Sequence, residues 1–201
     1  MNERYTKLAT DSWKKMIFNS GIVASNFTPA TGAVDEADIL FSTTGDISFT
    51  AARDVEDGGA DVNNCPENTF QLAKAKSWVA SLSGTSVNIS TSIAKDLLGN
   101  ADIGATDTSK ITPRGVLATT DFADKWFIMN YSDKMGAANG GSVAIHLMNA
   151  LNVDGISITS SREGNGQMSF NFQAYYDLEN PSVVPFEIFV KAGVAEPVAG
   201  A

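Results

Sequence analysis

Residues 167–176 alternate strictly between two kinds of side chain. One set is mostly bulky and apolar: Met168, Phe170, Phe172, Ala174 and Tyr176. The other set is polar or aromatic: Gln167, Ser169, Asn171, Gln173 and Tyr175. Because successive side chains of a strand point to opposite faces of a sheet, this period of two predicts a half-buried β-strand. The chain must therefore build a sheet with one covered face.

Short apolar runs between turn residues predict the other strands. They cover residues 22–23, 37–41, 46–52, 70–77 and 79–90 (around Ser83 and Gly84), 124–131, 141–151, 154–161 and 183–190. Helices are expected at 12–19 and 92–98, the first ending at Gly21 and the second running from a Ser90 or Thr91 cap to Gly99. The sequence thus predicts a mainly β (α+β) fold, an antiparallel β-sandwich or barrel with one or two flanking α-helices.

The chain length of 201 residues suits one domain. We expect an N-terminal arm and helix over residues 1–20, a β-domain over 21–193 and a flexible tail over 194–201. Residues 54–69 lack periodicity and predict a long loop, which is uncommon unless it is functional or disordered.

The composition excludes several classes of protein. No apolar run is long enough to cross a membrane, and the N-terminus has no secretory signal pattern. A single cysteine, Cys65, and a single histidine, His146, exclude an internal disulfide framework and make a histidine-based metal site implausible. The net charge of −9 disfavours tight binding to nucleic acid phosphates.

Reactive motifs are missing as well. Residues 136–141 are glycine-rich but lack the Lys-Ser/Thr ending of a phosphate-binding loop, so they predict a turn. Residues 54–61 do not have the spacing of a calcium loop. Cys65 has acidic neighbours that disfavour a thiolate, and His146 fits a polar position on a strand. We expect no enzyme activity, no cofactor and no metal.

Two features of the sequence suggest that some surfaces of its strands are covered by protein instead of by bulk water. The predicted strands expose short uncharged side chains with few of the lysines or prolines that guard sheet edges. These side chains are Ser86, Asn88, Ser90, Ser157, Thr159, Ser169, Asn171 and Gln173. Residues 126–129 are apolar on both faces of their strand. Either this chain covers them, as in the centre of a sandwich, or another copy of the chain does.

Charge is distributed unevenly along the chain. Residues 1–20 have four basic and two acidic side chains, whereas residues 31–69 have nine acidic side chains and Arg53. Complementary regions in one molecule favour head-to-tail self-association. The alternative is that the acidic loop serves only solubility.

Three groups of segments, in order along the chain, resemble the major tail (tail tube) proteins of long, non-contractile-tailed bacteriophages, particularly those of Firmicutes. They comprise residues 10–14, 19–22, 37–40 and 45–49; residues 61–69, 82–85 and 94–99; and residues 111–114, 144–151, 164–170 and 184–189. The resemblance lies in their order and spacing across residues 10–193, and no single segment is diagnostic.

The resemblance implies the β-sandwich or barrel also used by type VI secretion tubes. It implies a homo-oligomer: six copies close a ring with a continuous inner β-barrel, and rings stack around a tape-measure protein, between tail terminator and distal tail proteins. DNA would pass without specific binding, and the protein would be made in the bacterial host cytoplasm and end in the virion tail. Candidate inter-ring and inter-subunit contacts are Asp54, Glu56, Asp57, Asp61, Asn64, Lys14, Lys15 and Trp126.

A different class of protein also fits the predicted fold. A monomeric carbohydrate-binding β-sandwich would use exposed aromatic side chains as stacking platforms. The candidates for such platforms are Trp126, Tyr131, Tyr175 and Tyr176. Such a module would stay monomeric, whereas a tube protein would assemble.

Overall fold

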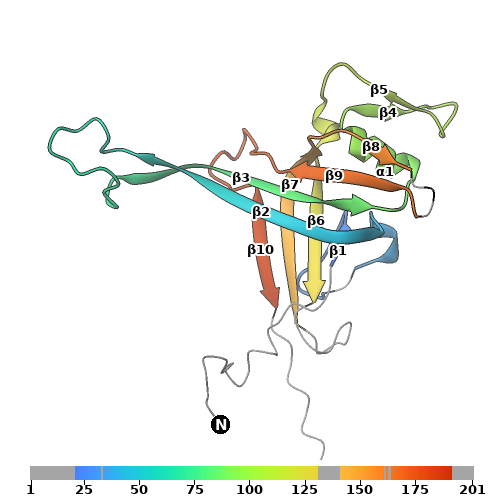
Figure 1. The fold of residues 1–201 in the computed structure, drawn as a ribbon, viewed down its shortest axis with the longest axis horizontal. Helices are drawn as coiled ribbons and strands as arrows, with labels where there is room; N and C mark the ends of the chain where they lie inside the picture. Colours follow the sequence, from blue (N-terminus) through green and yellow to red (C-terminus); the bar gives the residue numbers. More distant parts are fainter. Residues whose placement is uncertain (1–20, 33, 131–140, 161, 163, 192–201) are drawn as a thin grey trace, which may run out of the picture.

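A computed structural model describes residues 21–32, 34–130, 141–160, 162 and 164–191 (Figure 1). The predicted arm and first helix of residues 1–20 and the predicted tail of residues 194–201 lie outside this described part. So does the predicted turn at 136–141, apart from Gly141.

The described residues form a mainly β structure around one eight-stranded antiparallel sheet. Its main path runs β1 (Ile22–Ala24), β6 (Ala123–Asn130), β7 (Ser142–Asn152), β9 (Gln167–Gln173), β3 (Ala73–Ser86) and β2 (Thr43–Asp57). Two shorter strands branch from it: β10 (Phe186–Lys191) pairs with β7, and β8 (Ser157–Thr159) pairs with β9.

Strand β7 belongs to both halves of this sheet. Its first residues lie between β6 and β10, and its last two described pairs, at Leu151 and Asn152, are with β9. In Figure 1, β6, β7 and β10 run across the direction of β2, β3 and β9. The sheet therefore folds over itself at β7, so that its two halves enclose a core, as in a sandwich.

The main core lies between these two halves. Phe170, Phe172 and Leu82 meet Phe127, Ile145 and Leu147 in one cluster. The predicted alternation is confirmed, because Met168, Phe170, Phe172 and Ala174 are buried while the odd-numbered residues between them are exposed or half-buried. Tyr176 lies beyond the end of β9 and is exposed.

A second cluster covers the other face of β6. It consists of Ala24, Phe27, Trp126, Ile128 and Ala144. The chain itself therefore covers both faces of the apolar segment 126–129, with Phe127 on the main core side and its neighbours on the other. Of the two explanations that the sequence left open, cover by the same chain is the one observed.

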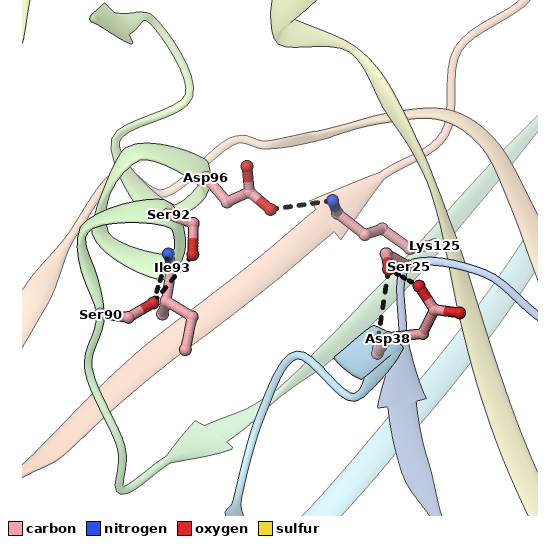
Figure 2. Close-up of polar contacts among 7 residues, drawn as sticks. All are labelled: Ser25, Asp38, Ser90, Ser92, Ile93, Asp96 and Lys125. Carbon is pink, nitrogen blue, oxygen red and sulfur yellow. Dashed lines mark hydrogen bonds and ion pairs between the residues drawn. The ribbon is translucent and has the colours of Figure 1, made fainter. Parts of the chain in front are cut away.

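The predicted second helix is present as α1 (Thr91–Leu98). The Ser90 hydroxyl accepts a hydrogen bond from the Ile93 backbone N–H at 3.2 Å, which is a standard N-cap contact. Gly99 ends the helix with φ +79°, a conformation that glycine adopts without a steric penalty. Lys125 of β6 fixes the helix to the sheet, because its buried ammonium lies 3.0 Å from the Asp96 carboxylate (Figure 2).

The region after α1 is rich in turns. It contains the short hairpin of β4 (Ala101–Ile103) and β5 (Ile111–Pro113), followed by the 3-10 helix η3 (Thr119–Asp121). Arg114 forms ion pairs with both Asp102 and Asp121 in this region. This hairpin lies beside α1 in Figure 1.

Several sequence predictions were wrong. Residues 37–41 form no strand but the 3-10 helix η2 (Glu36–Asp38) and a single bridge between Ala24 and Ile39. The Ser25 hydroxyl and backbone N–H both donate to Asp38, so polar contacts over a separation of 13 residues hold this segment instead of a regular strand (Figure 2). The strand predicted over residues 154–161 is reduced to the three residues of β8.

The two strands predicted over 70–77 and 79–90 are one continuous strand, β3. Gly84 marks no turn there. A Cβ atom at this position would lie 2.7 Å from the Phe170 Cζ, so the glycine makes room for a core ring. The predicted loop 54–69 also shifts, because β2 continues to Asp57 and the connection to β3 spans residues 58–72.

We expect Gly21→Ala to lower the melting temperature by more than Gly45→Ala. Both glycines have a positive φ, +74° and +70°. A Cβ at Gly21 would also lie 2.7 Å from the Ile128 carbonyl oxygen, whereas no atom of the described residues lies within 4 Å of a Cβ at Gly45. Backbone strain alone costs about 1 kcal/mol, and we expect about twice that loss at Gly21.

Thermal unfolding followed by circular dichroism measures the difference between the two alanine variants. Gly45→Ala is the matched control, since it has the backbone strain without the steric contact. Equal losses in the two variants would contradict the close packing of Gly21 against β6.

Candidate subunit-contact surface

A long two-stranded ribbon projects from the sandwich. We use "the ribbon" for residues 53–77, which include the ends of β2 and β3 and the connection between them. The two strands pair from Thr43 with Ser86 to Asp57 with Ala73, but β9 pairs with β3 only between Ser81 and Ser86 in the described structure. The ribbon therefore extends past the rest of the sheet, as Figure 1 shows.

Aromatic contacts hold the base of the ribbon to the body. The Trp78 ring meets the Phe186 ring edge-on at 5.5 Å, and the Arg53 guanidinium lies 5.7 Å above the Trp78 ring. The Trp78 backbone N–H donates to the Tyr176 hydroxyl at 2.9 Å. These contacts fix the point at which the ribbon leaves the body.

Beyond Trp78 the ribbon exposes apolar side chains. Val55 lies on β2, and Val62 and Phe70 lie in the connection. Phe70 is 82% exposed and Val62 is 54% exposed. None of residues 58–72 belongs to either buried core cluster. The ribbon thus offers apolar contact area that the described part of this chain leaves open to solvent.

Hydrogen bonds order the connection. The Asp57 carboxylate accepts the backbone N–H groups of Asn68 at 2.7 Å and Gly59 at 2.9 Å. Asn64 and Asn68 adopt positive φ angles of 66° and 58°, which asparagine tolerates better than most residues. The bond from Asn68, followed by the bond from Gly59, lowers the pKa of Asp57 below its ordinary value of 3.8.

We expect the Asp57 carboxylate to hold the connection until well into the acid range. A lowered pKa in the folded state stabilises the structure at pH values above 3.8, and this contribution is lost as the pH falls through the lower folded value. The amide proton shifts of Gly59 and Asn68, measured by NMR, should move together with a midpoint below 3.8. Asp57→Asn should abolish this shared titration, and Asp61→Asn should leave it unchanged. Independent titration of the two amides would contradict the shared carboxylate.

The predicted contact residues fall into three groups. Asp54, Glu56, Asp61 and Asn64 are exposed on the ribbon, and Asp57 holds its connection together. Lys14 and Lys15 lie outside the described residues. Trp126 is only 8% exposed, because it stacks on His146 at 4.0 Å and packs against Phe27. Trp126 therefore offers little surface to a neighbouring subunit in the folded chain.

The ribbon is less acidic than residues 31–69 suggested. In the register of the hairpin, Glu56 lies opposite Lys74, and Lys76 follows on the same returning strand. These two lysines lie beyond position 69 in the sequence. The charge sum over residues 31–69 therefore leaves them out, although the hairpin brings them near the carboxylates of β2. Basic side chains therefore lie among the acidic and apolar residues of the ribbon.

The sequence did not reveal the free edges of the sheet. Among the described residues, β2 pairs with β3 alone and β10 pairs with β7 alone. The middle of β2, residues 47–52, has no charged side chain, and Ile188 and Val190 of β10 are more than half exposed. Such edges can accept a further strand through their backbone groups.

The described residues form no candidate metal centre. They contain no group of three or more His, Cys, Asp or Glu side chains placed to hold a metal ion. His146 lies on β7, with its Nε2 3.0 Å from an Asp124 carboxylate oxygen and its ring against Trp126. This is the polar strand position that the sequence predicted for it. Within the described part, no helix is long and apolar enough to span a membrane.

Among the described residues, the candidate aromatic platforms of a carbohydrate-binding module do not come together as one surface. Trp126 is buried, Tyr131 lies outside the described residues, and Tyr175 packs edge-on against Phe122. Tyr176 lines an open cleft of about 230 Å³ together with Trp78, Lys76 and Pro181. The Tyr176 hydroxyl is the acceptor for the Trp78 N–H, which orients this ring.

Comparisons with known proteins add no relatives to this description. No protein-family model matches the chain, and no curated protein matches it.

Proposed function

We propose that this protein is a structural subunit of a bacteriophage tail, which assembles into hexameric rings that stack into a tail tube. The tube is the conduit through which DNA reaches the host. The ribbon is the observation on which this proposal depends. The order of segments that resembles tail tube proteins supplies the ring and tube geometry.

The ribbon supports assembly because few contacts within the chain stabilise it. An isolated two-stranded hairpin is marginally stable in water. The ribbon nevertheless extends from the body with Phe70 and Val62 exposed at its connection. Burying these side chains against a neighbouring ring would stabilise the assembly by about 25 cal/mol for each Å² of apolar surface removed from water.

The free edges support contacts within a ring. The unpaired edge of β2 and that of β10 belong to different parts of one molecule. Pairing of β2 in one copy with β10 in the next is therefore a head-to-tail contact, and such contacts close into a ring when the rotation between copies allows it. The resemblance to tail tube proteins indicates six copies for that ring.

This role needs partners but no catalytic site. In the proposed tail, the tube surrounds a tape-measure protein and ends at terminator and distal tail proteins. The protein is made in the host cytoplasm and functions in the virion. DNA passes through without specific binding, in agreement with the net charge of −9.

Negative-stain electron microscopy across a concentration series tests the proposal. We expect rings or tubes as concentration rises, with a matching increase in sedimentation coefficient. A protein that stays monomeric at every concentration and changes its tryptophan fluorescence when glycans are added would instead be a carbohydrate-binding module. Persistent monomers contradict self-assembly.

A further inference from the structure

Three residue pairs of the described structure have the sequence Asp-Gly or Asn-Gly. They are Asp57-Gly58, Asp154-Gly155 and Asn165-Gly166. In such pairs the glycine nitrogen can attack the side-chain carbonyl carbon of the residue before it, which closes a succinimide ring. Glycine favours this attack because it has no side chain to block the approach and adopts many backbone angles. The contacts of each pair show which one is free to react.

The pair Asp57-Gly58 is held in an unreactive arrangement. The Gly58 N–H, whose nitrogen would attack, donates to the Leu72 carbonyl oxygen at 3.1 Å. The Asp57 carboxylate accepts the N–H groups of Asn68 and Gly59, and these bonds lower the pKa of Asp57 below its ordinary value of 3.8. An ionised carboxylate has no good leaving group, so both reacting groups of this pair are occupied.

The pair Asp154-Gly155 is fixed on two sides. The Asp154 carboxylate accepts a hydrogen bond from the Asn171 amide at 3.0 Å, and the Gly155 carbonyl oxygen accepts one from the buried Asn152 side chain at 2.7 Å. Ring closure requires the side chain to turn toward the next backbone nitrogen. These two bonds oppose that rotation.

The pair Asn165-Gly166 is free. It lies in the connection between β8 and β9, and both of its residues are exposed (Figure 1). Pairing of the two strands begins only at Gln167, opposite Thr159. Within the described part of the chain, neither the Asn165 side chain nor the Gly166 N–H has a hydrogen-bond partner. This pair also has the better leaving group, because its side chain is an amide that departs as ammonia.

We propose that Asn165 is a site of spontaneous deamidation. The Gly166 nitrogen forms a bond to the Asn165 Cγ, the bond from Cγ to Nδ2 breaks, and Nδ2 leaves as ammonia with the proton that the Gly166 nitrogen gives up. Water then adds to either carbonyl carbon of the succinimide and opens it to aspartate or isoaspartate. The reaction is intramolecular, and water is its only co-reactant.

Both products change the end of the β8–β9 hairpin. Each adds a negative charge to a chain whose net charge is already −9. Isoaspartate also inserts a methylene group into the main chain, just before Gln167 pairs with Thr159. The inference does not depend on the proposed function, because the reaction takes place within one chain.

Peptide mapping by mass spectrometry tests the site in the natural full-length chain, folded and incubated in warm, mildly alkaline buffer. We expect the peptide that contains Asn165 to gain the mass difference between NH and O, and to separate into aspartate and isoaspartate forms. Asn64 and Asn68 are the internal controls, since both are exposed but precede Cys65 and Thr69. They should react several-fold more slowly. Asn139-Gly140 lies outside the described residues, and its peptide can be followed separately.

Gly166→Ala is the matched variant. A Cβ at this position would lie 3.7 Å from the Thr159 carbonyl oxygen, which is an ordinary contact, and Gly166 is not among the glycines with a positive φ. The variant should keep the melting temperature of the natural chain and lose ammonia from Asn165 several-fold more slowly. An unchanged rate would show that the loss does not pass through the succinimide.

The same map after incubation in denaturant separates the effect of the fold from that of the sequence. Asn165 should react in the folded chain nearly as fast as in the denatured chain, whereas Asp57 should isomerise in the denatured chain alone. An Asn165 that persists in the folded chain and reacts in the denatured one would overturn the inference. So would equal rates at Asn165 and Asn68 in the folded chain.

Discussion

A variant in which Asn-Gly replaces residues 58–72 is expected to fold as a monomer and to form no tubes. The replaced residues lie outside both core clusters, and Asp57 and Ala73 already face each other across the hairpin. A two-residue Asn-Gly turn suits such a pair. Shortening the connection also reduces the entropy cost of closing it, by about 2 kcal/mol. The variant loses the exposed contact residues Val62 and Phe70, so ring stacking should stop.

Circular dichroism melting and negative-stain microscopy test this variant together. We expect an unchanged or slightly higher melting temperature and no tubes at concentrations where the natural protein assembles. Asn64→Gly is the matched control, because glycine keeps the positive φ of 66° and the full connection remains. Tubes of normal length from the shortened variant would show that the ribbon tip takes no part in stacking.

Asn152→Ala should be the most destabilising of the single substitutions considered. The Asn152 side chain is buried, and its amide donates to the carbonyl oxygens of Leu97 at 2.6 Å and Gly155 at 2.7 Å. Its carbonyl oxygen accepts the backbone N–H of Asn171 at 2.7 Å. Alanine leaves three backbone groups without this partner, at a cost of about 1 kcal/mol each.

The expected total loss is therefore about 3 kcal/mol, or a fall in melting temperature of about 10 °C for a chain of this size. Denaturant titration gives the free energy of unfolding directly. Asn180→Ala is the control, because Asn180 is exposed in the segment before β10, and it should change stability by less than 0.5 kcal/mol or so. A loss below about 1 kcal/mol at Asn152 would mean that water replaces the missing amide.

Local signals in the sequence predicted the elements that depend on local physics. The strand around Phe170 alternates with a period of two, and α1 has a serine cap before it and a glycine after it. The strand predicted at residues 37–41 was wrong because these apolar residues have the composition of a strand. The hydrogen bonds between Ser25 and Asp38 join residues far apart in the sequence, so no local pattern predicts them.

The candidate contact surface was predictable in part. The long polar connection after β2 was visible in the sequence, and four of the predicted contact residues lie exposed on the ribbon. The burial of Trp126 could not be predicted from the sequence. Phe27 covers its ring and lies far from it along the chain. The free edges of β2 and β10 depend on which strands become neighbours, and that order is a property of the whole fold.

The position of β3 between β2 and β9 creates a delay during synthesis. β2 and β3 are adjacent in the chain, whereas β9 begins only at Gln167, long after β3 ends at Ser86. At about 5–20 residues per second, a ribosome takes on the order of 4–16 s to make the intervening segment. During that interval the flank of β3 that later pairs with β9 exposes its unpaired backbone N–H and C=O groups. Nascent chains on one messenger RNA thus have time to pair at this flank, and a shorter delay would limit such pairing.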